Sequence, residues 1–324
     1  MNPFQHLYDA CNTGDPAEKL ANLPDFPRLI DVELTSSCNF KCLMCPTGNK
    51  SLKRKATFMK SKVWNRIIGQ CLQQDTAIRL IGWGEPLLHP QVIYFIKDAA
   101  HAGLLVHVNT NASHINLGTA APLVQAGLAS IKFSFQGVDK KSYAEMRQID
   151  FFDGMLDAIK IMRRARGSAR LPYMAASTSI TYETEEQVEE FRDKLAPLVD
   201  HLGIGRTIFD FMDLSAVRLK PDQIALLTRL KELCTDEKKH PDPCPEVFDK
   251  LSIHADGSVV VCCNDYDGVT DLGNVPDRSI AEIWHHPQME GYRERLARKE
   301  YTGPLCSVCY DYAGLTNGDP GDVS

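Results

Sequence analysis

The sequence lacks any apolar run of the length that crosses a bilayer, since no stretch approaches ~18 consecutive apolar residues. Its first residues, MNPFQHLYDACNTGDP, lack the basic and apolar segments of a secretory leader. It also lacks an excess of basic residues, because 42 acidic side chains outnumber 36 Lys and Arg and leave a net charge of −6. We therefore expect a cytoplasmic protein that is neither a membrane protein nor a general nucleic-acid binder.

Cysteine, in contrast, is abundant. Eleven cysteines in a cytoplasmic protein stay reduced, so they are better interpreted as metal ligands than as a disulfide framework. The odd number leaves at least one cysteine outside any pairing. A length of 324 residues predicts about two domains, each able to bury a core.

Three of the cysteines form a C-x3-C-x2-C array, Cys38 to Cys45, directly after the apolar run Leu29–Leu34. A structural zinc site and a fully ligated iron–sulfur cube each need four protein ligands, and no further Cys or His follows until Cys71. Three close thiolates favour a cube with one open iron, at which a ligand binds and reacts. The alternative is a zinc knuckle that borrows a distant ligand.

Strand and helix patterns alternate over residues 29–209. Repeated βα units indicate a parallel sheet with helices outside it, and six units suit an open, incomplete barrel. Ligands of such sheets bind at the C-terminal strand ends, where the cysteine loop falls. The predicted strands are Leu29–Leu34, Thr76–Trp83, Leu104–Asn109, Ala129–Gln136, Tyr173–Thr181 and Gly203–Phe209. The predicted helices are Lys62–Leu72 with Ser61 as N-cap, Gln91–Ala102, Ile115–Ala126, Lys140–Arg147, Gly154–Arg166 and Thr184–Leu195.

Polar or glycine-rich segments follow the other predicted strands. In Gly82-Trp83-Gly84-Glu85-Pro86, two glycines let the backbone approach a ligand closely. Asn109-Thr110-Asn111 ends the third strand with polar side chains, and Ser134-Phe135-Gln136-Gly137 ends the next strand. Arg147 ends the predicted helix Lys140–Arg147, where a lone Arg is by default a surface charge. Each feature alone has an ordinary alternative, a βα turn or a surface charge.

More cysteines follow the helix predicted at Pro221–Leu233. A Cys, a Cys-Cys pair and a C-x2-C provide one four-ligand site, and the thiolates alone do not choose between zinc and iron–sulfur. A hairpin with a turn at Asp256-Gly257 is predicted between Leu251–His254 and Val259–Cys263, and a helix at Ser279–His285. The simplest ligand set is Cys244, Cys262, Cys306 and Cys309. Cys263 is either the ligand in place of Cys262, a buried small residue or a hydrogen-atom donor.

These segments together resemble the radical S-adenosylmethionine (SAM) enzymes. C-x3-C-x2-C with the aromatic Phe40 before the second cysteine is similar to the signature of that family. The resemblance implies that Cys38, Cys42 and Cys45 hold a [4Fe–4S] cluster whose open iron binds the amino and carboxyl groups of SAM. An electron from the cluster cleaves SAM to a 5′-deoxyadenosyl radical, which abstracts a hydrogen atom from the substrate. It also implies a flavodoxin or ferredoxin as electron donor.

The same resemblance assigns residues to SAM. The loop at Gly82 resembles the "GGEP" loop whose backbone receives the SAM amino group, with Trp83 as a departure. Arg147, after Tyr143, matches an Arg placed to meet the SAM carboxylate. Ser134 to Gly137 resembles a Ser-x-Asp-Gly segment, from which Gln136 departs because it is uncharged. The implied SAM-binding residues are Phe40, Gly82, Trp83, Gly84, Glu85, Asn109, Asn111, Ser134, Gln136 and Arg147.

The C-terminal cysteines resemble the twitch form of the SPASM extension, which holds one auxiliary [4Fe–4S] cluster. The implied fold class is α/β, a partial (β/α)6 TIM-like barrel with a small C-terminal cysteine-rich twitch/SPASM-like domain. The expected boundaries are an N-terminal arm over 1–27, the barrel over 28–212, the auxiliary-cluster domain over 213–310 and a flexible tail over 311–324.

The architecture resembles that of 2-deoxy-scyllo-inosamine dehydrogenase, and the short arm before the barrel favours a small substrate. The leading hypothesis is oxidation of an alcohol on a sugar, nucleotide sugar or aminocyclitol to a ketone, with the auxiliary cluster as electron acceptor. The alternatives are a radical epimerase with Cys263 as hydrogen donor, a peptide- or protein-modifying enzyme, and a zinc-stabilised binding module without enzymatic activity. The basic run Lys50–Lys55 is either a solvated loop or a binder of an anionic substrate. The general base stays open among Asp210, Asp213, Asp265 and Asp267.

Overall fold

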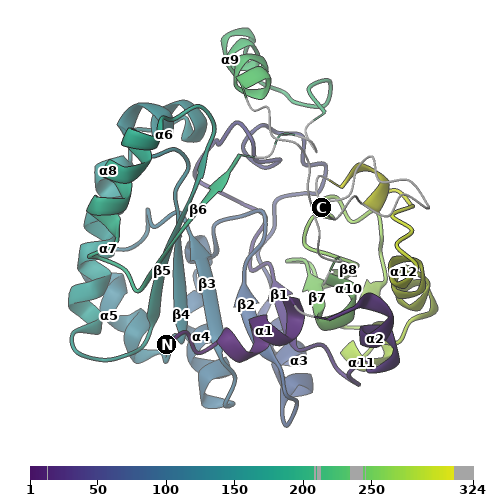
Figure 1. The fold of residues 1–324 in the computed structure, drawn as a ribbon. Coiled ribbons are helices and arrows are strands. Elements are labelled where there is room, and N and C mark those ends of the chain that lie inside the picture. The colour runs from purple at the N-terminus through teal and green to yellow at the C-terminus, as the bar shows by residue number, and fades with distance from the viewer. Residues whose placement is uncertain (13, 208, 210–212, 234–243, 245, 310–324) are drawn as a thin grey trace.

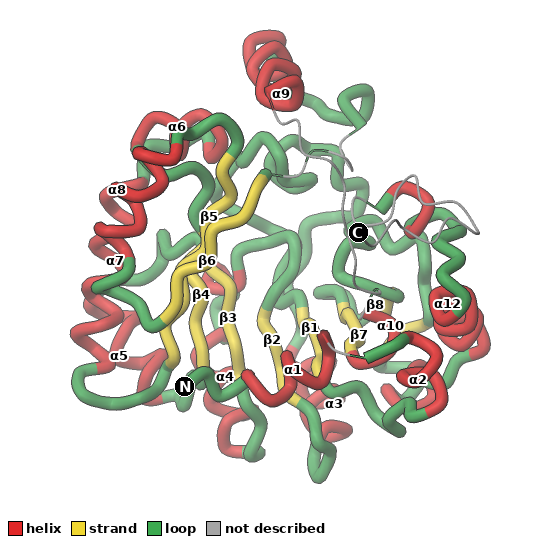
Figure 2. Tube along the Cα trace, in the orientation of Figure 1, coloured by secondary structure: helices red, strands yellow, loops and turns green. Residues whose placement is uncertain are grey.

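A nine-stranded sheet forms the centre of the molecule (Figures 1 and 2). The computed structural model describes residues 1–324 except 13, 208, 210–212, 234–243, 245 and 310–324. The strand order is β6-β5-β4-β3-β2-β1-β7-β8-β9, and the neighbours from β6 to β7 are parallel. Strands β1 to β6 are Leu29–Val32, Ala77–Leu80, Val106–Thr110, Ser130–Ser134, Tyr173–Ile180 and His201–Arg206. Because β6 and β1 are not neighbours, the six-stranded barrel is open, as the sequence predicts.

Helices cover the outer face of this sheet, and the predicted order of strands and helices is confirmed. Their apolar sides pack on Ile30, Val32, Ile131, Phe133 and similar strand residues. The helices between the barrel strands are α3 Ser61–Cys71, α4 Val92–His101, α5 Leu117–Gln125, α6 Lys140–Arg147, α7 Phe152–Arg166 and α8 Glu185–Leu195, with a short 3₁₀ turn η1 at Pro86–Leu88. The N-cap prediction at Ser61 is wrong, because Lys60 occupies that position and the Ser61 hydroxyl donates to Gln91 Oε1 at 2.8 Å.

The opposite face of the barrel strands lines an interior that we call the lumen. Strand side chains alternate between the two faces, so Asp31 of β1 faces the lumen while Ile30 and Val32 face the helices. Asp31 meets Arg79 of the neighbouring β2 there, with N–O distances of 2.6 and 2.7 Å. The lumen is therefore polar, although the strands that surround it are buried.

One end of the lumen is closed by the N-terminal helix α1, Gln5–Asn12. Phe4, Leu7 and Cys11 form a buried cluster with Leu29 and Ala77, which begin β1 and β2. This cluster lies at the N-terminal ends of the strands (Figure 1). A ligand therefore has access from the C-terminal end, where the cysteine loop lies.

The C-terminal region continues the barrel sheet. Strand β7, Lys250–Ile253, pairs in parallel with β1, and β8, Ser258–Val260, returns antiparallel to β7, which confirms the predicted hairpin. The two regions also share one hydrophobic core. A domain boundary near residue 213 stays a prediction, and the tail over 311–324 lies outside the described residues. The remaining elements are β9 Gly273–Asn274, α2 Pro16–Ala21, α9 Pro221–Leu233, α10 Glu246–Asp249, α11 Ile280–Trp284, α12 Pro287–Ala297 and the 3₁₀ turn η2 Cys306–Val308.

Candidate active site

The loop after β1 brings Cys38, Cys42 and Cys45 together. Cys42 is buried and the other two are partly exposed. A Cβ added at Gly48 would lie 2.3 Å from the Cys42 carbonyl oxygen, so the chain can fold back this tightly only with glycine there. Burial, with smaller contributions from the neighbouring Cys42 and Cys45, raises the pKa of the Cys38 thiol to about 12. Thiols in this setting become thiolates when a metal centre supplies positive charge.

Hydrogen-bond donors surround the sulfur atoms of this loop. The Arg147 guanidinium donates to Cys42 Sγ at 3.5 Å, and the Phe40 amide lies 3.5 Å from Cys38 Sγ. The Asn111 side-chain amide lies 3.8 Å from Cys38 Sγ. Donors to ligand sulfurs are one of the ways in which proteins tune iron–sulfur clusters.

The Gly82-Trp83-Gly84-Glu85 segment packs directly against β1 and the residues that follow it. A Cβ at Gly84 would lie 2.0 Å from the Thr35 carbonyl oxygen, and one at Gly82 would lie 2.7 Å from Glu33 Cβ. Both positions require glycine because a side chain would displace backbone or a buried carboxylate. The two glycines thus hold the loop beside the cysteine array.

Trp83 connects this loop to three other segments. Its amide donates to Glu33 Oε2 at 3.1 Å, and its carbonyl accepts from the Thr47 hydroxyl at 2.6 Å. Its indole Nε1 donates to the carbonyl oxygen of Cys263 at 2.9 Å, and its ring meets Tyr266 edge-on with centroids 5.6 Å apart. Trp83 therefore joins the glycine loop to the C-terminal cysteine region.

Glu85 faces the protein interior and ties the glycine loop to the end of β3. Its carboxylate accepts from the Thr110 hydroxyl and the Asn111 amide, both at 2.7 Å, and from the Leu87 amide at 3.1 Å. The side chain is 2% exposed. Glu85 thus acts here through the loop that it positions.

The remaining sequence-predicted residues separate into two groups. Asn109 and Ser134 are half-buried at the lumen, and His107 Nε2 lies 2.7 Å from Asn109 Oδ1. Gln136 is buried instead against β5 and β6, where its amide donates to the Ser179 carbonyl at 3.2 Å and to the Thr207 hydroxyl. The structure brings Asn109 and Ser134 to the lumen, whereas it directs the Gln136 amide towards Ser179 and Thr207.

Arg147, at the end of α6, lies above the cysteine loop. It donates to the Ser134 carbonyl, and its guanidinium carbon lies 6.0 Å from the Phe40 ring centroid and 5.8 Å from that of Tyr143. Its Nε atom is buried without a hydrogen-bond partner. This donor is free for a ligand with an oxygen acceptor.

The C-terminal cysteines form a second group. Burial is the main cause that raises the pKa of Cys244 far above its ordinary value. The charges of Glu246 and of nearby Cys306 and Cys309 also raise this pKa. The pKa of Cys262 is raised by burial and also by Cys263, Glu246 and Cys244. Cys244 thus interacts with Cys262, Cys306 and Cys309, the other members of the predicted set, and their role as ligands stays a prediction.

Cys263 has different surroundings. Ligand atoms of Cys263, Asp31 and Glu246 lie within 4.8 Å of one another. Asp31 is paired with Arg79, and Glu246 accepts from Lys250 Nζ at 2.6 Å and from the Cys263 thiol. Because both carboxylates already have cationic partners, this group is a buried ion network. It draws the Cys263 thiol towards β1 and favours Cys262 as the cluster ligand.

The acidic residues considered as general bases have local structural roles. Asp213 accepts from the amide and hydroxyl of Ser215, and Asp267 accepts from the Lys53 amide at 2.7 Å. Asp265 is 1% exposed and accepts from three backbone amides and a hydroxyl of its own turn. Asp210 lies outside the described residues.

Glu33 and Arg54 are residues that the sequence interpretation missed. Arg54 makes two bonds to the Glu33 carboxylate, of 2.9 and 3.0 Å, and its Nε donates to the Tyr266 carbonyl. Arg54 of the basic run is thus largely buried and connects Glu33, after β1, with Tyr266 of the C-terminal region. We call this connection the Arg54 strap. Alternating acidic residues in the otherwise apolar segment Leu29–Leu34 were the signal that could have revealed a polar lumen face.

Two regions of the chain match family profiles. Residues 32–195 match the Radical SAM superfamily, and residues 244–310 match SPASM, an iron–sulfur cluster-binding domain. The first match spans half of the chain and contains the cysteine array, the glycine loop and Arg147. The chain belongs to the radical SAM superfamily. Its SPASM region confirms the predicted auxiliary cluster class.

Several curated relatives of this radical SAM enzyme align with it over only part of their own length. Molybdenum cofactor biosynthesis protein moc-5 of Caenorhabditis elegans is 23% identical over 64% of this chain and 33% of the relative. AdoMet-dependent heme synthase of Methanosarcina barkeri is 26% identical over 51% of this chain and 46% of the relative. The chain thus spans a third to about half of the length of these two relatives. An uncharacterised protein of Methanocaldococcus jannaschii is 30% identical over 78% of this chain and 81% of its own.

Solved structures share the fold. BtrN in complex with AdoMet and 2-DOIA has a TM-score of 0.51 and 17% identity, covering 83% of this chain and 87% of BtrN. SuiB of Streptococcus suis bound to S-adenosylmethionine has a TM-score of 0.65 and 19% identity, covering 84% and 69%. Native anSMEcpe with bound AdoMet has a TM-score of 0.61 and 15% identity, covering 82% of each chain. These likenesses confirm the partial barrel with its cysteine-rich extension.

The cofactors of this radical SAM enzyme are SAM, the radical SAM [4Fe–4S] cluster and an auxiliary iron–sulfur cluster. The residues present fit these groups. Three thiols lie beside amide and guanidinium donors, a buried Arg147 Nε lacks a partner, and Cys244 interacts with three further thiols. Thiolate sulfur is the ligand type that iron–sulfur clusters take.

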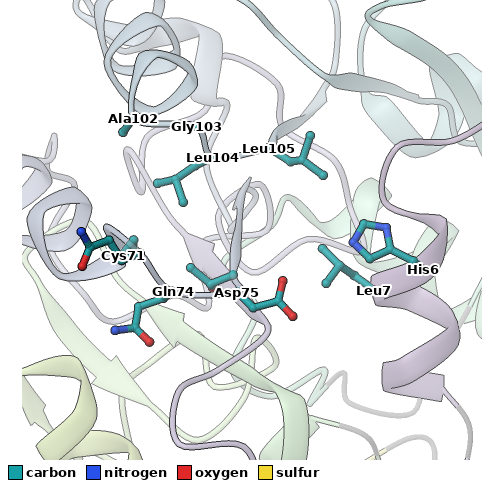
Figure 3. A pocket seen from close by; sticks show the side chains of 11 residues that line it. His6, Leu7, Cys71, Gln74, Asp75, Ala102, Gly103, Leu104 and Leu105 are labelled. Atoms are coloured by element: carbon teal, nitrogen blue, oxygen red, sulfur yellow. The ribbon is translucent and has the colours of Figure 1, made fainter.

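A cavity of about 330 Å³ lies away from this site (Figure 3). His6 and Leu7 of α1 line one side, with Asp75 and Leu104 before β2 and β3 on the other. These residues are at the N-terminal ends of the strands, opposite the cysteine loop.

Among the described residues, no helix combines the length and apolar character needed to cross a membrane.

Proposed function

We propose that this radical SAM enzyme oxidises an alcohol of a small polyhydroxylated substrate, a sugar, nucleotide sugar or aminocyclitol, to a ketone. The substrate carbon loses one hydrogen atom and its hydroxyl loses a proton, and the resulting substrate radical gives up one electron as the carbon–oxygen double bond forms. When bound, SAM and the two clusters supply the radical that takes the hydrogen atom and the acceptor that takes the electron. The chain's own residues hold these groups and the substrate.

Cys38, Cys42 and Cys45 are the proposed ligands of the radical SAM cluster. The proposed auxiliary ligands are Cys244, Cys262, Cys306 and Cys309. Arg147 offers its unpartnered Nε to the SAM carboxylate, and the backbone of the Gly82–Glu85 segment accepts the SAM amino group. In this assignment Glu85 and Gln136 position loops rather than touch SAM.

The contact between Trp83 and Cys263 is the observation that carries this proposal. It places a residue of the SAM loop 2.9 Å from the backbone of the cysteine pair, one residue from the proposed ligand Cys262. This contact supports a radical site and an auxiliary cluster site that border the same end of the lumen. A substrate held there is close to both the source of the radical and an electron acceptor.

The polarity of the lumen supports a polyhydroxylated substrate. Asn109, Ser134, Ser177 and Ser179 are half-buried on the lumen face of β3, β4 and β5. Amide and hydroxyl groups both donate and accept hydrogen bonds, as sugar hydroxyls do. A few such groups placed in a concave site fix the orientation of a ligand.

The test uses anaerobically purified enzyme with SAM, a reductant and a panel of polyols and aminocyclitols. An oxidised product two mass units lighter than its substrate is expected, together with one 5′-deoxyadenosine per turnover. Cys306→Ala should still cleave SAM but lose the ketone, because the auxiliary cluster then lacks a ligand. Iron analysis of this variant gives a readout independent of turnover. Ketone formation by Cys306→Ala at the wild-type rate would contradict the electron-acceptor role.

Two other outcomes are distinguishable in the same experiment. Epimerisation in deuterated water leaves deuterium on carbon without a change in oxidation state, and Cys263→Ala should then abolish it. Peptide modification is supported by similarity to PqqA peptide cyclase of Gluconobacter oxydans, 27% identical over 81% of this chain, and by the likeness to SuiB. A peptide that stimulates SAM cleavage where every polyol fails would establish that function instead.

A further inference from the structure

We propose that Lys132 binds an oxyanion group of the substrate, a phosphate or a carboxylate, inside the lumen. The inference rests on the proposed function in one respect, that the lumen holds the substrate. It adds a chemical class, because a neutral polyol would leave this lysine without a partner. It also identifies a substrate-binding residue that the sequence patterns did not indicate.

The position of Lys132 follows from strand alternation. Its neighbours Ile131 and Phe133 are fully buried in the core beneath the helices, so Lys132 points to the opposite face. It lies in register with Asn109 of β3 and Ala175 of β5. The charge of Lys132 also acts on buried His107. The ammonium group therefore lies within the lumen, on the same face of β4 as Ser134 and two residues before it.

The other charged groups that face the lumen are paired. Asp31 is bonded to Arg79 through two N–O contacts of 2.6 and 2.7 Å, and Glu33 is bonded to Arg54 through two more. Glu246 is paired with Lys250 at 2.6 Å. His107 is neutral near pH 7, because burial lowers its pKa to about 3.

Apart from Arg147, which is assigned to the SAM carboxylate, Lys132 alone keeps an unpaired charge among the described lumen residues. No hydrogen bond or ion pair to its ammonium occurs in the part of the chain that the structure describes. Lys132 is half-buried, and a partly desolvated cation without a partner favours binding of an anion that enters the lumen. Burial lowers the pKa of Lys132, the charge of Arg79 lowers it further, and Asp31 opposes both. A bound oxyanion would reverse these two effects.

The strands beside Lys132 leave room for a ligand. Ala175 and Ser177 of β5, and Gly203 and Gly205 of β6, carry small side chains or none on the same face. A Cβ added at Gly205 would meet no atom within 4 Å. The basic run near the site is a less suitable anion binder because Arg54, its buried member, is already committed to Glu33.

The first experiment measures access to the amine directly. Anaerobic holoenzyme is methylated with ¹³C-formaldehyde and a borane reductant, and each lysine is quantified by peptide mass spectrometry. Inorganic phosphate and acetate are the probes, in separate arms, with exposed Lys160 as the control. We expect phosphate or acetate to slow Lys132 methylation at least tenfold and saturably while Lys160 changes less than twofold. Equal effects on both lysines, or a Lys132 that is never methylated, would overturn the proposal.

The second experiment uses the reaction. Lys132→Met should raise KM at least tenfold for phosphorylated or carboxylated polyols, and Lys132→Arg should restore part of the loss because it keeps the charge. Lys160→Met is the matched control and should change nothing. An increase of tenfold or more in the SAM dissociation constant of Lys132→Met would overturn the proposal, because the ligand would then be SAM.

The two proposals fail in different ways. A neutral polyol oxidised equally well by wild type and Lys132→Met would leave alcohol oxidation standing and overturn the role of Lys132. An anionic compound that binds in a Lys132-dependent manner and is converted without oxidation would support the role of Lys132 and overturn alcohol oxidation. The anion-protection measurement requires no turnover, so it tests Lys132 whichever reaction the enzyme performs.

Discussion

Replacing Arg54 by methionine should destabilise the protein strongly, although Arg54 belongs to a basic run that looks like a solvated loop. The guanidinium makes bonds of 2.9 and 3.0 Å to Glu33, and the two side chains are 12% and 3% exposed. Arg54→Met keeps most of the aliphatic volume and removes only the charge and the donors. The Glu33 carboxylate then remains buried without its cation.

The expected cost follows from this burial. Removing one partner of a buried ion pair costs about 3–5 kcal/mol, because the other charge stays desolvated. Glu33 still accepts from the Trp83 amide at 3.1 Å, so the lower end, about 3 kcal/mol, is expected. With an unfolding entropy of roughly 2 cal/mol/K per residue, this corresponds to a Tm lower by about 5 °C for 324 residues.

Urea denaturation and thermal melts of wild type and Arg54→Met measure this cost. The matched control is Arg192→Met, which removes an exposed ion pair of similar length, 3.1 Å to Glu189, with 47% and 64% exposure. Exposed pairs contribute about 0–1 kcal/mol, so the control should lose less than about 1 kcal/mol. The double variant Glu33→Gln/Arg54→Met should recover part of the loss, because no buried charge remains unpaired. If Arg54→Met loses no more stability than Arg192→Met, the strap contributes nothing special and the reasoning is refuted.

Three further outcomes are expected. Gly84→Ala should abolish SAM binding and cost about 1–3 kcal/mol, since its Cβ would meet the Thr35 and Ser37 carbonyls at 2.0 and 2.6 Å. Gly69→Ala in α3, where a Cβ meets nothing within 4 Å, should raise the free energy of unfolding by about 0.5–1 kcal/mol. Equilibrium dialysis with SAM and urea denaturation compare the two variants. His107 stays neutral in the fold with its pKa lowered by burial to about 3, whereas the unfolded chain binds a proton near pH 6.5, so stability falls as pH falls below 6.5. His107→Gln should reduce that slope by up to about 1.4 kcal/mol per pH unit in denaturation curves at pH 5 to 7, and an unchanged slope would contradict this assignment. Trp83→Phe removes the bond to the Cys263 carbonyl, worth about 1 kcal/mol, and should speed amide exchange in a peptide covering 259–266, whereas exchange at the wild-type rate would speak against a docking role for the indole.

The barrel was predictable because its pattern is local. Six apolar strands alternate with amphipathic helices, and the structure places them in the predicted order. The boundaries differ by a few residues, as in β3, which is predicted at Leu104–Asn109 and observed at Val106–Thr110. Helix α12 was not predicted: Gly291 within it weakens the local helical signal, although Pro287 suits the first helical turn.

The parts of the site carried by long-range contacts were not predictable. The pairing of β7 with β1 joins residues about 220 positions apart, and no local periodicity specifies it. The choice between Cys262 and Cys263 depends on which one faces Glu246 and Asp31, and those neighbours come from two separate segments. The assignment of Gln136 to SAM likewise rested on its place in the chain, whereas packing turns its amide towards Ser179 and Thr207.

The sequence by itself determined the chemistry, because cysteine spacing, glycine positions and strand order are properties of neighbouring residues along the chain. It was sufficient for the radical SAM family and the barrel, and it predicts the two sets of cysteine ligands. Only the tertiary structure decided how charges are paired. It buries Arg54 against Glu33, seals Asp31 with Arg79 and leaves Lys132 alone in the lumen. Pairing depends on distances across the sheet, which a one-dimensional pattern does not contain.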